Sequence, residues 1–210
     1  MIRGSICKKC RRAGQKLFLR EERCFTPKCA MIKKPYVPGM KAKKHRSAIS
    51  EYGAQLAEKQ KLKRIYGLTE RQFRKYFEEA AKAKGVVTDV LIKKLETRLD
   101  NVIFRLGWGG SRAKTKQMVS HGHILLNGSR VDIPSINVKK GDIIEVRQGS
   151  LKKVIFKDLD TKMKKQTIPS WLSVEGKENG IFKITVSGTP IRSEVLLPVD
   201  LAMIVEFYSR

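Results

Sequence analysis

Acidic residues, long apolar runs and late cysteines are all scarce in this 210-residue chain. Only 20 Asp and Glu stand against 45 Lys and Arg, which gives a net charge of +25. No apolar run approaches the roughly 20 residues that a membrane-spanning helix needs, and the N-terminus lacks the apolar region of a secretory signal. These absences argue against a membrane surface as the polyanion that the basic residues bind, and nucleic acid is therefore the favoured partner.

The positive charge is unevenly distributed along the chain. Residues 1–50 hold 15 basic and 2 acidic residues, whereas residues 166–210 hold 4 basic and 5 acidic residues. A chain that used charge only for solubility would mix the signs and carry a net charge of about 2–8 for a small domain. The uneven excess predicts an extended basic face that binds a polyanion, with a C-terminal part that mostly packs.

Helical signals dominate the residues between 50 and 122. The patterns predict a helix over residues 51–66 and a second over residues 69–85, which opens on a capping box. Apolar residues at spacings of three and four predict a third helix from residue 88 or 89 to residue 107. A fourth, short helix is expected from residue 111, a serine N-cap, to residues 121–122.

After residue 122 the pattern changes to that of strands. Ile124–Leu126 and Arg130-Val131 flank Asn127-Gly128, which is a strong signal for a two-residue hairpin turn. Further candidate strands are Ile143–Arg147, Lys153–Phe156, Phe182–Val186 and Leu201–Phe207. Because the helices come first and the strands later, the expected fold class is α+β.

All four cysteines lie in the first 29 residues, as Cys7-x2-Cys10 followed by Cys24-x4-Cys29. Two such pairs can surround a tetrahedral Zn²⁺ ion, and four protein ligands would leave no open position for catalysis. Disulfides are the alternative, because the number of cysteines is even. The missing signal peptide and the charge, typical of a reducing compartment, favour zinc. We therefore predict one structural zinc ion in a basic N-terminal arm.

Three cations crowd the first turns of the short helix. Arg112, Lys114 and Lys116 oppose the helix macrodipole there, which folding alone would not favour. A bound phosphate resolves the conflict, because free backbone N–H groups and basic side chains can then point at one anion. The predicted positive surface continues through Arg130 and Lys139-Lys140.

Two further features allow two interpretations each. His121 and His123 are either ordinary turn residues or RNA contacts. The basic run Lys162–Lys165 is either a solvated linker or an RNA contact.

Several motifs closely resemble the small RNA-binding module shared by ribosomal protein four, certain pseudouridine synthases and a tyrosyl-tRNA synthetase appendix. They are Ser111–Ala113, Met118–Ile124, Leu126–Gly128, Arg130-Val131 and Lys140–Asp142. Other motifs, spread over nearly the whole chain, resemble the small-subunit ribosomal protein four family of bacterial type specifically. These are Arg23-Cys24, Pro27–Met31, Glu58–Leu62, Arg64–Gly67, Glu70–Arg74, Arg98–Val102, Pro169–Leu172 and Glu206–Arg210.

The resemblance implies two packed domains behind a zinc-bearing arm. It assigns residues 1–45 to the arm, residues 46–97 to a helical domain completed by about residues 185–210, and residues 98–165 to an inserted RNA-binding domain. That domain is expected to combine two helices with an antiparallel hairpin and sheet. Residues 166–210 are expected to pack back on the helical domain.

The resemblance also implies a structural, non-enzymatic role on the cytoplasmic small ribosomal subunit. The protein would bind small-subunit ribosomal RNA directly, nucleate assembly of the five-prime domain and contribute to translational accuracy. Expected neighbours are ribosomal protein five, other small-subunit proteins and messenger RNA near its entry path, with no homo-oligomer. The resemblance also extends the expected RNA contacts to Lys61, Arg64, Arg98 and Arg105. It places Lys41, Lys43, Lys44 and Arg46 near entering messenger RNA.

Two other classes of protein share single features with this chain. Arg98-Leu99-Asp100 is similar to the catalytic Asp motif of pseudouridine synthases, but only about 60 residues follow the module, which is short for a separate catalytic domain. A zinc-finger regulator of DNA would share the cysteine pairs and the charge. It would also need a finger helix with histidine ligands, which the sequence lacks.

Overall fold

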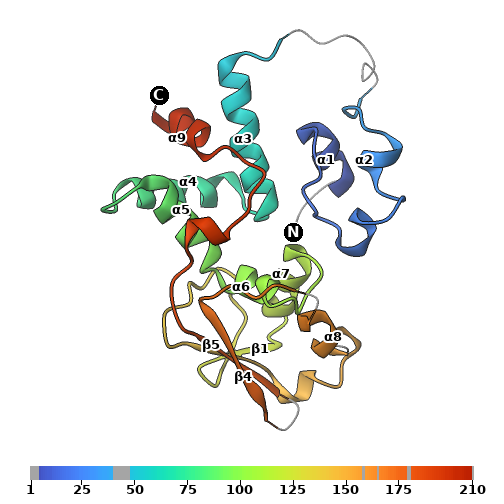
Figure 1. Ribbon diagram of the computed structural model, residues 1–210, viewed down its shortest axis with the longest axis vertical. Coiled ribbons are helices and arrows are strands. Elements are labelled where there is room, and N and C mark those ends of the chain that lie inside the picture. Colours follow the sequence, from blue (N-terminus) through green and yellow to red (C-terminus); the bar gives the residue numbers. More distant parts are fainter. Residues whose placement is uncertain (1–4, 40–47, 158, 165, 179–180, 210) are drawn as a thin grey trace. The chain divides into compact units, whose positions relative to one another are not determined.

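The computed structural model describes residues 5–39, 48–157, 159–164, 166–178 and 181–209 (Figure 1). The chain divides into two compact units. The helical unit comprises residues 1–88 and 197–210, and the module unit comprises residues 89–196. In the described ranges, no helix is both long enough and apolar enough to cross a membrane.

The helical unit contains the basic arm, here residues 5–39, and a group of longer helices. The arm forms α1 (Ile6–Ala13), the 3-10 turn η1 (Glu21–Cys24) and α2 (Ala30–Lys33). The longer helices are α3 (Glu51–Ile65), α4 (Glu70–Ala81) and α9 (Leu201–Ser209). The predicted first helix and the capping box of Thr69 with Gln72 are confirmed, but α4 ends at Ala81, four residues before the predicted stop at Gly85.

Aromatic and charged side chains join α3, α4 and α9. The Tyr208 ring lies 4.3 Å from that of Phe77, centroid to centroid. The Nζ atom of Lys59 donates to Glu70 Oε1 over 2.6 Å and lies 4.3 Å from the centroid of the Phe207 ring. Burial would raise the pKa of Glu70, but ion pairs with Lys59 and Lys63 outweigh it and hold that pKa below its ordinary value.

The predicted strand over Leu201–Phe207 is wrong, because these residues form α9. Leu201 and Ile204, three apart, are both buried, which is the spacing of one helix face. Asp200 precedes the helix, and its Oδ1 atom accepts hydrogen bonds from the backbone N–H of Ala202 at 2.9 Å and of Met203 at 3.5 Å. Asp200 is therefore the N-cap residue, and this signal favours a helix over a strand, although the run of apolar residues that follows obscures it in the sequence.

The module unit contains helices, short 3-10 turns and one sheet. Its helices are α5 (Val87–Glu96, begun in the helical unit), α6 (Leu99–Arg105), α7 (Arg112–Ser120) and α8 (Leu159–Lys164), which includes the first residues of the Lys162–Lys165 run. The 3-10 turns are η2 (Gln148–Ser150), η3 (Val154–Phe156) and η4 (Arg192–Glu194). The strands are β1 (Ile124–Leu126), β2 (Ser129–Val131), β3 (Ile143–Val146), β4 (Leu172–Glu178) and β5 (Ile181–Val186).

The five strands form an antiparallel sheet in the order β2-β1-β3-β5-β4. The predicted hairpin is confirmed: Leu126 pairs with Ser129, and Asn127 and Gly128 both have positive φ, at 52° and 77°. The predicted strands at Ile143–Arg147 and Phe182–Val186 are also confirmed. Apolar side chains of the sheet and of the packed pair α6 and α7 share one core, in which Trp108 is fully buried. The observed fold class is α+β, as predicted.

The third predicted helix is in fact two, α5 and α6, with a break at Thr97 and Arg98. The backbone there pairs with another segment of the module, as Val138 N–H donates to Thr97 O over 2.8 Å and Leu99 N–H donates to Ile136 O over 2.8 Å. These long-range bonds replace the helical ones, and the apolar spacing of three and four continues across the break. Periodicity alone therefore could not locate it.

Two further strand expectations need correction. Lys153–Phe156 is not a strand; its last three residues form the 3-10 turn η3, in which Phe156 is buried and Val154 is 78% exposed. Strand β4 was not predicted, and it pairs with β5 through a register shift between Glu175 and Lys177. Such a bulge interrupts the alternation on which strand prediction relies.

Candidate nucleic-acid interface

Helix α7 is seated by its buried face. Thr115, Met118 and Val119 are buried, and a Cβ at Gly109 would lie only 2.6 Å from the Thr115 methyl carbon, so the loop before α7 passes tightly against it. Ser111 occupies the N-cap position with an extended backbone, but its side chain does not cap the helix. The three predicted cations of α7, Arg112, Lys114 and Lys116, are half-buried.

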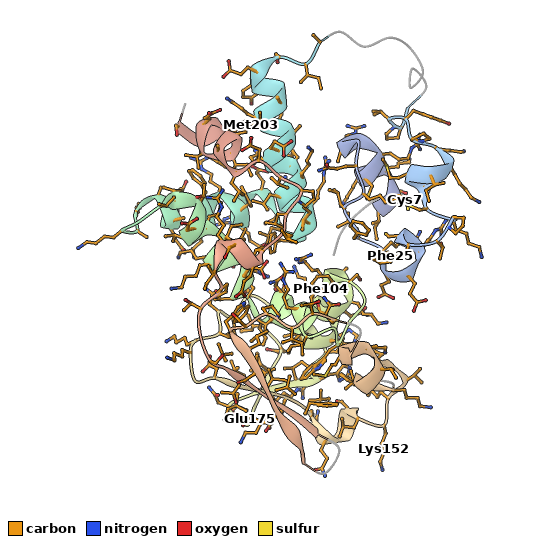
Figure 2. All side chains as sticks on the ribbon, in the orientation of Figure 1. Cys7, Phe25, Phe104, Lys152, Glu175 and Met203 are labelled. Atoms are coloured by element: carbon orange, nitrogen blue, oxygen red, sulfur yellow. The ribbon has the colours of Figure 1, made fainter. Side chains whose placement is uncertain are left out.

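A buried carboxylate organises the cations near α7. Glu96 is 1% exposed, and both its oxygens accept hydrogen bonds from Arg105, each over 2.8 Å. Asn101 Nδ2 also donates to Glu96, and Asn101 Oδ1 accepts from Arg112 Nε over 2.7 Å. The Arg112 guanidinium also lies 4.3 Å from the centroid of the Phe104 ring, which Figure 2 labels. Arg105 and Arg112 are therefore anchored by the protein before any ligand binds.

The turn between α7 and β1 gathers further positive groups. A Cβ at Gly122 would meet the Arg130 guanidinium at 2.2 Å, so this cation packs directly on the turn. His123 is buried, and its Nδ1 atom lies 3.0 Å from Ser150 Oγ. Burial, followed by the charges of Lys153, His121 and Arg147, lowers the pKa of His123 and thus favours its neutral form. Of the two histidines, His123 is a satisfied interior residue and His121 is exposed.

The loop before β3 is fixed by one aspartate. Asp142 accepts a hydrogen bond from Lys139 N–H over 2.7 Å and another from Asn127 Nδ2 over 2.9 Å. The loop and the hairpin turn are therefore held together, and Lys139 and Lys140 are exposed on it. The two lysines also line a cavity of about 440 Å³ to which α5 contributes Lys93 and Lys94.

In the helical unit, the predicted contacts have different environments. Lys61 forms an ion pair with Glu58, whereas Arg64 is half-buried and lines a cavity with cations of α1. Burial and the charge of Arg12 lower the pKa of Arg64, as expected of cations that face one another. Lys41, Lys43, Lys44 and Arg46 lie outside the described residues.

The four thiols of the arm belong to its small interior. Cys10, Cys24 and Cys29 are buried and Cys7, labelled in Figure 2, is half-buried. The backbone N–H of Arg20 donates to Cys24 Sγ over 3.3 Å. Burial raises the pKa of Cys10, with the other three cysteines adding to the shift against an opposing hydrogen bond from the Leu17 backbone. Within the described ranges, no group of three or more cysteine, histidine or carboxylate side chains is arranged to hold a metal ion.

Known proteins resemble the chain along its whole length. Residues 1–96 match the family model "Ribosomal protein S4/S9 N-terminal domain", and residues 97–144 match the model "S4 domain". A small ribosomal subunit protein uS4 of Thermus thermophilus is 46% identical over 209 residues, which are 99% of this chain and 98% of the relative. Those of Pelotomaculum thermopropionicum and Natranaerobius thermophilus are 47% and 48% identical over 207 residues, with the same coverage. The chain belongs to the uS4 family.

Membership of the uS4 family confirms the family that the motifs resemble, and the relatives reported above are named as proteins of the small ribosomal subunit. The matched S4 domain contains α6, α7 and the β1–β2 hairpin, together with the loop of Lys139 and Lys140. Most of the residues that the sequence predicts to contact RNA thus lie in the part of this uS4 chain that matches an RNA-binding domain.

Arg98, like His123, is buried and does not belong to the predicted RNA-binding surface. It is 1% exposed, and its Nε and Nη2 atoms donate to both oxygens of Asp100, over 3.0 and 2.7 Å. The structure therefore places Arg98 in the interior, apart from the surface cations. This ion pair engages both oxygens of Asp100, which is the carboxylate that makes Arg98-Leu99-Asp100 similar to a catalytic motif.

Sequence reasoning missed several cations that this uS4 structure brings to the predicted surface. Arg147 N–H donates to His123 O over 2.9 Å, and the charges of Lys153 and Arg147 contribute to the lowered pKa of His123. Lys93 and Lys94 line one cavity with the loop lysines. No local signal marks Lys93 and Lys94, because charges on one helix face are ordinary for a solvated helix. Arg147 ends a predicted strand next to the recognised module, and that position could have drawn attention to it.

Proposed function

We propose that this uS4 chain binds small-subunit ribosomal RNA directly as a structural component of the subunit. The observation that carries the proposal is the preformed cationic surface of the S4 domain. Arg112 is anchored through Asn101, Arg130 packs on Gly122, and Asp142 fixes the loop of Lys139 and Lys140. Cations held in place before binding lose little conformational entropy when RNA arrives, which favours recognition of one RNA shape.

The proposed mechanism has an electrostatic part and a shape-dependent part. Exposed and half-buried Lys and Arg neutralise phosphates and release counterions, so affinity should fall steeply with salt. The rigid α7 and hairpin surface should then select a folded RNA junction rather than a base sequence. By this route the protein would nucleate assembly of the five-prime domain of the small-subunit RNA and contribute to translational accuracy. Ribosomal protein five and entering messenger RNA, the latter near residues 41–46, are the further partners that we propose.

We infer that the role is structural and not catalytic. Asp100, the candidate catalytic residue of the enzyme alternative, is buried in a two-bond ion pair with Arg98. A nucleophilic carboxylate needs access to its substrate, and this one has both oxygens turned to a neighbouring guanidinium.

We also propose that Cys7, Cys10, Cys24 and Cys29 hold one structural zinc ion. Four thiols in two closely spaced pairs form the donor set that Zn²⁺ prefers, and all four contribute to the small interior of the arm. Metal binding is coupled to folding in small zinc modules, so the ion would draw the thiols into its coordination sphere and order the chain around it. Metal analysis of the purified protein that finds no zinc would reject this part of the proposal.

The first experiment compares binding to the five-prime domain of small-subunit ribosomal RNA with binding to an unrelated structured RNA of equal length, across a salt series. A preference for the five-prime domain that survives rising salt supports shape-selective recognition. Equal, steeply salt-sensitive binding to both RNAs would overturn it and leave only a generic basic protein.

A paired variant sharpens that experiment. Lys139→Gln with Lys140→Gln should weaken binding to the five-prime domain about tenfold or more, because each exposed lysine would contact a phosphate. Lys75→Gln with Lys82→Gln removes the same charge from the middle of α4 and from the residue that follows this helix, and serves as the control. Equal losses in the two pairs would assign the effect to net charge and not to the proposed surface.

A further inference from the structure

The cleft between α1 and α3 in the helical unit is lined by cations that lie outside the S4 domain. We propose that it is a phosphate-binding site, which takes one phosphodiester group of the RNA that the S4 domain binds. This inference rests on the proposed function, because it assigns a second point of attachment for the same RNA. It adds Lys8, Lys9 and Arg12 to the residues that contact RNA and gives Arg64 a definite role.

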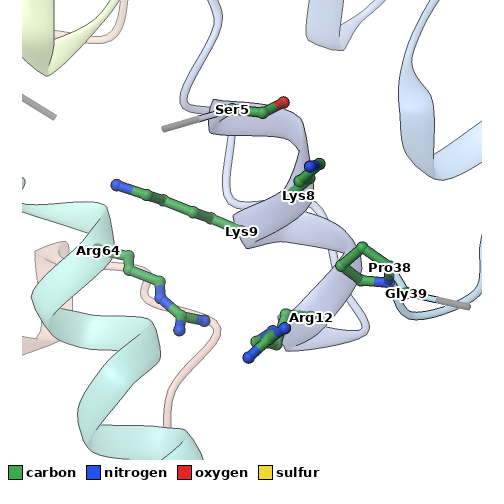
Figure 3. Close-up of a pocket in the computed structure, with 7 residues that line it drawn as sticks. All are labelled: Ser5, Lys8, Lys9, Arg12, Pro38, Gly39 and Arg64. Carbon is green, nitrogen blue, oxygen red and sulfur yellow. The ribbon is translucent and has the colours of Figure 1, made fainter. Parts of the chain in front are cut away.

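The cleft has a volume of about 450 Å³ and combines two elements that are distant in sequence. Seven residues line it: Ser5, Lys8, Lys9, Arg12, Pro38, Gly39 and Arg64. Figure 3 shows Lys9 extending from α1 toward α3, while Arg64 of α3 and Arg12 of α1 reach into the same space. Four of the seven lining residues are cationic, and none is acidic.

Packing alone does not explain why four cations converge there. Among the described residues, no acidic group forms an ion pair with Lys8, Lys9, Arg12 or Arg64. Like charges that face one cleft repel each other, and the repulsion increases as the cleft excludes water. An anion in the cleft removes this cost, and the forked donors of two guanidinium groups match the oxygens of a phosphate.

Two features favour RNA over an acidic protein segment as the source of the anion. The lining offers only Pro38 as an apolar side chain, whereas protein interfaces rely on buried aromatic and aliphatic anchors. Ser5 precedes α1, whose first turn contains no acidic residue, so backbone N–H groups at the helix N-terminus also favour a phosphate.

The test is phosphate-ethylation interference on the five-prime-domain RNA with the full-length, zinc-replete protein. We would compare the parent protein with Lys9→Gln/Arg64→Gln, and use Lys75→Gln/Lys82→Gln as the charge-matched control. Ethylation at one or two adjacent phosphates should interfere with binding of the parent and the control but not of the cleft variant. The cleft variant should also bind roughly tenfold more weakly, with a salt slope reduced by about one to two.

The outcomes separate this proposal from the proposed function. If the parent protein shows no preference for the five-prime domain, the proposed function fails first. If the parent retains its preference and the cleft variant has the same interference pattern and salt slope, the phosphate site is rejected. Unchanged RNA binding together with loss of incorporation into small subunits would likewise reject RNA and indicate an acidic protein partner.

Two further measurements protect the test against a folding artefact. Lys9→Arg keeps the charge and should keep the interference pattern of the parent. The melting temperature of Lys9→Gln/Arg64→Gln without RNA should equal or exceed that of the parent, because the substitution removes repulsion between cations. A lower melting temperature would mean that these side chains serve the fold, and it would overturn the assignment.

Discussion

The basic arm of the helical unit and the module unit are stabilised by different interactions. In the module, residues of α6, α7 and the sheet form one core in which Leu99, Trp108 and Ile144 are fully buried. In the arm of the helical unit, residues 5–39, the buried residues are Cys10, Cys24, Cys29, Leu17 and Leu19. The module can therefore gain stability from apolar burial, whereas the arm has too little apolar area to fold by that means alone.

The comparison shows how a strongly basic protein can present cations and still fold. The module encloses part of its charge in buried networks around Glu96 and Asp100 and exposes the rest on a rigid surface. The arm has almost no acidic partners for its cations, so it depends on ligands, which we propose to be zinc and RNA phosphate. Four predictions test this difference.

The largest expected effect comes from removing the metal. Strong chelation, or Cys10→Ser, should abolish hydrogen-exchange protection over residues 5–39, because zinc supplies roughly 10–16 kcal/mol in comparable small sites. Protection in β1, β3 and β5 should not change, which makes the sheet an internal control. If the arm keeps its hydrogen-exchange protection without metal, the arm does not depend on zinc to fold.

The second prediction tests whether the module depends on its buried charge as well as on its core. Glu96→Ala would leave Arg105 and Asn101 without their common acceptor, and removing one partner of a buried pair costs about 3–5 kcal/mol. Urea unfolding of the module should therefore shift strongly. Glu79→Ala is the control, since its pair with Lys75 spans 4.0 Å at the surface and should contribute about 0.5 kcal/mol or less.

The elements that the sequence predicts well are those with a local cause. The capping box of Thr69 and the turn at Asn127-Gly128 depend on residues close in the chain, and both appear as expected. The break at Thr97 and Arg98 depends on hydrogen bonds to residues 136–138, and β4 depends on pairing with β5. Such long-range contacts leave no local pattern, which is why these features were missed.

The same distinction applies to the candidate site. Motif resemblance and charge predicted an RNA-binding surface on α7, the hairpin and the Lys139-Lys140 loop. They could not separate the buried Arg98 from the exposed Lys140, because the two residues differ only in their surroundings in the fold. The cleft of Lys9 and Arg64 was out of reach for the same reason, since α1 and α3 lie far apart in sequence.

A third, smaller effect should separate two cations of α7. Arg112→Ala removes the hydrogen bond to Asn101 and the contact with Phe104, so it should cost about 1–2 kcal/mol of stability as well as RNA affinity. Lys116→Ala should weaken RNA binding and leave stability within about 0.5 kcal/mol. Urea midpoints and RNA affinities of both variants check this, and unchanged RNA affinity in both would refute the assignment of α7 to RNA.

The smallest expected effect concerns the ion pairs that join α3 to α4 in the helical unit. Because the pKa of Glu70 is lowered in the folded state, its stabilising effect is present above the ordinary carboxyl pKa and is lost as pH falls through the folded pKa. The Glu70 side chain is 47% exposed, so water screens the pairs and the contribution should stay below about 1 kcal/mol. Unfolding midpoints of the helical unit between about pH 3 and about pH 7 should therefore fall less for Glu70→Gln than for the parent. The unfolding midpoint of the Glu79→Gln control should fall with pH as much as that of the parent. If the midpoints of all three proteins fall equally, the ion pairs of Glu70 with Lys59 and Lys63 contribute nothing to the stability of this unit.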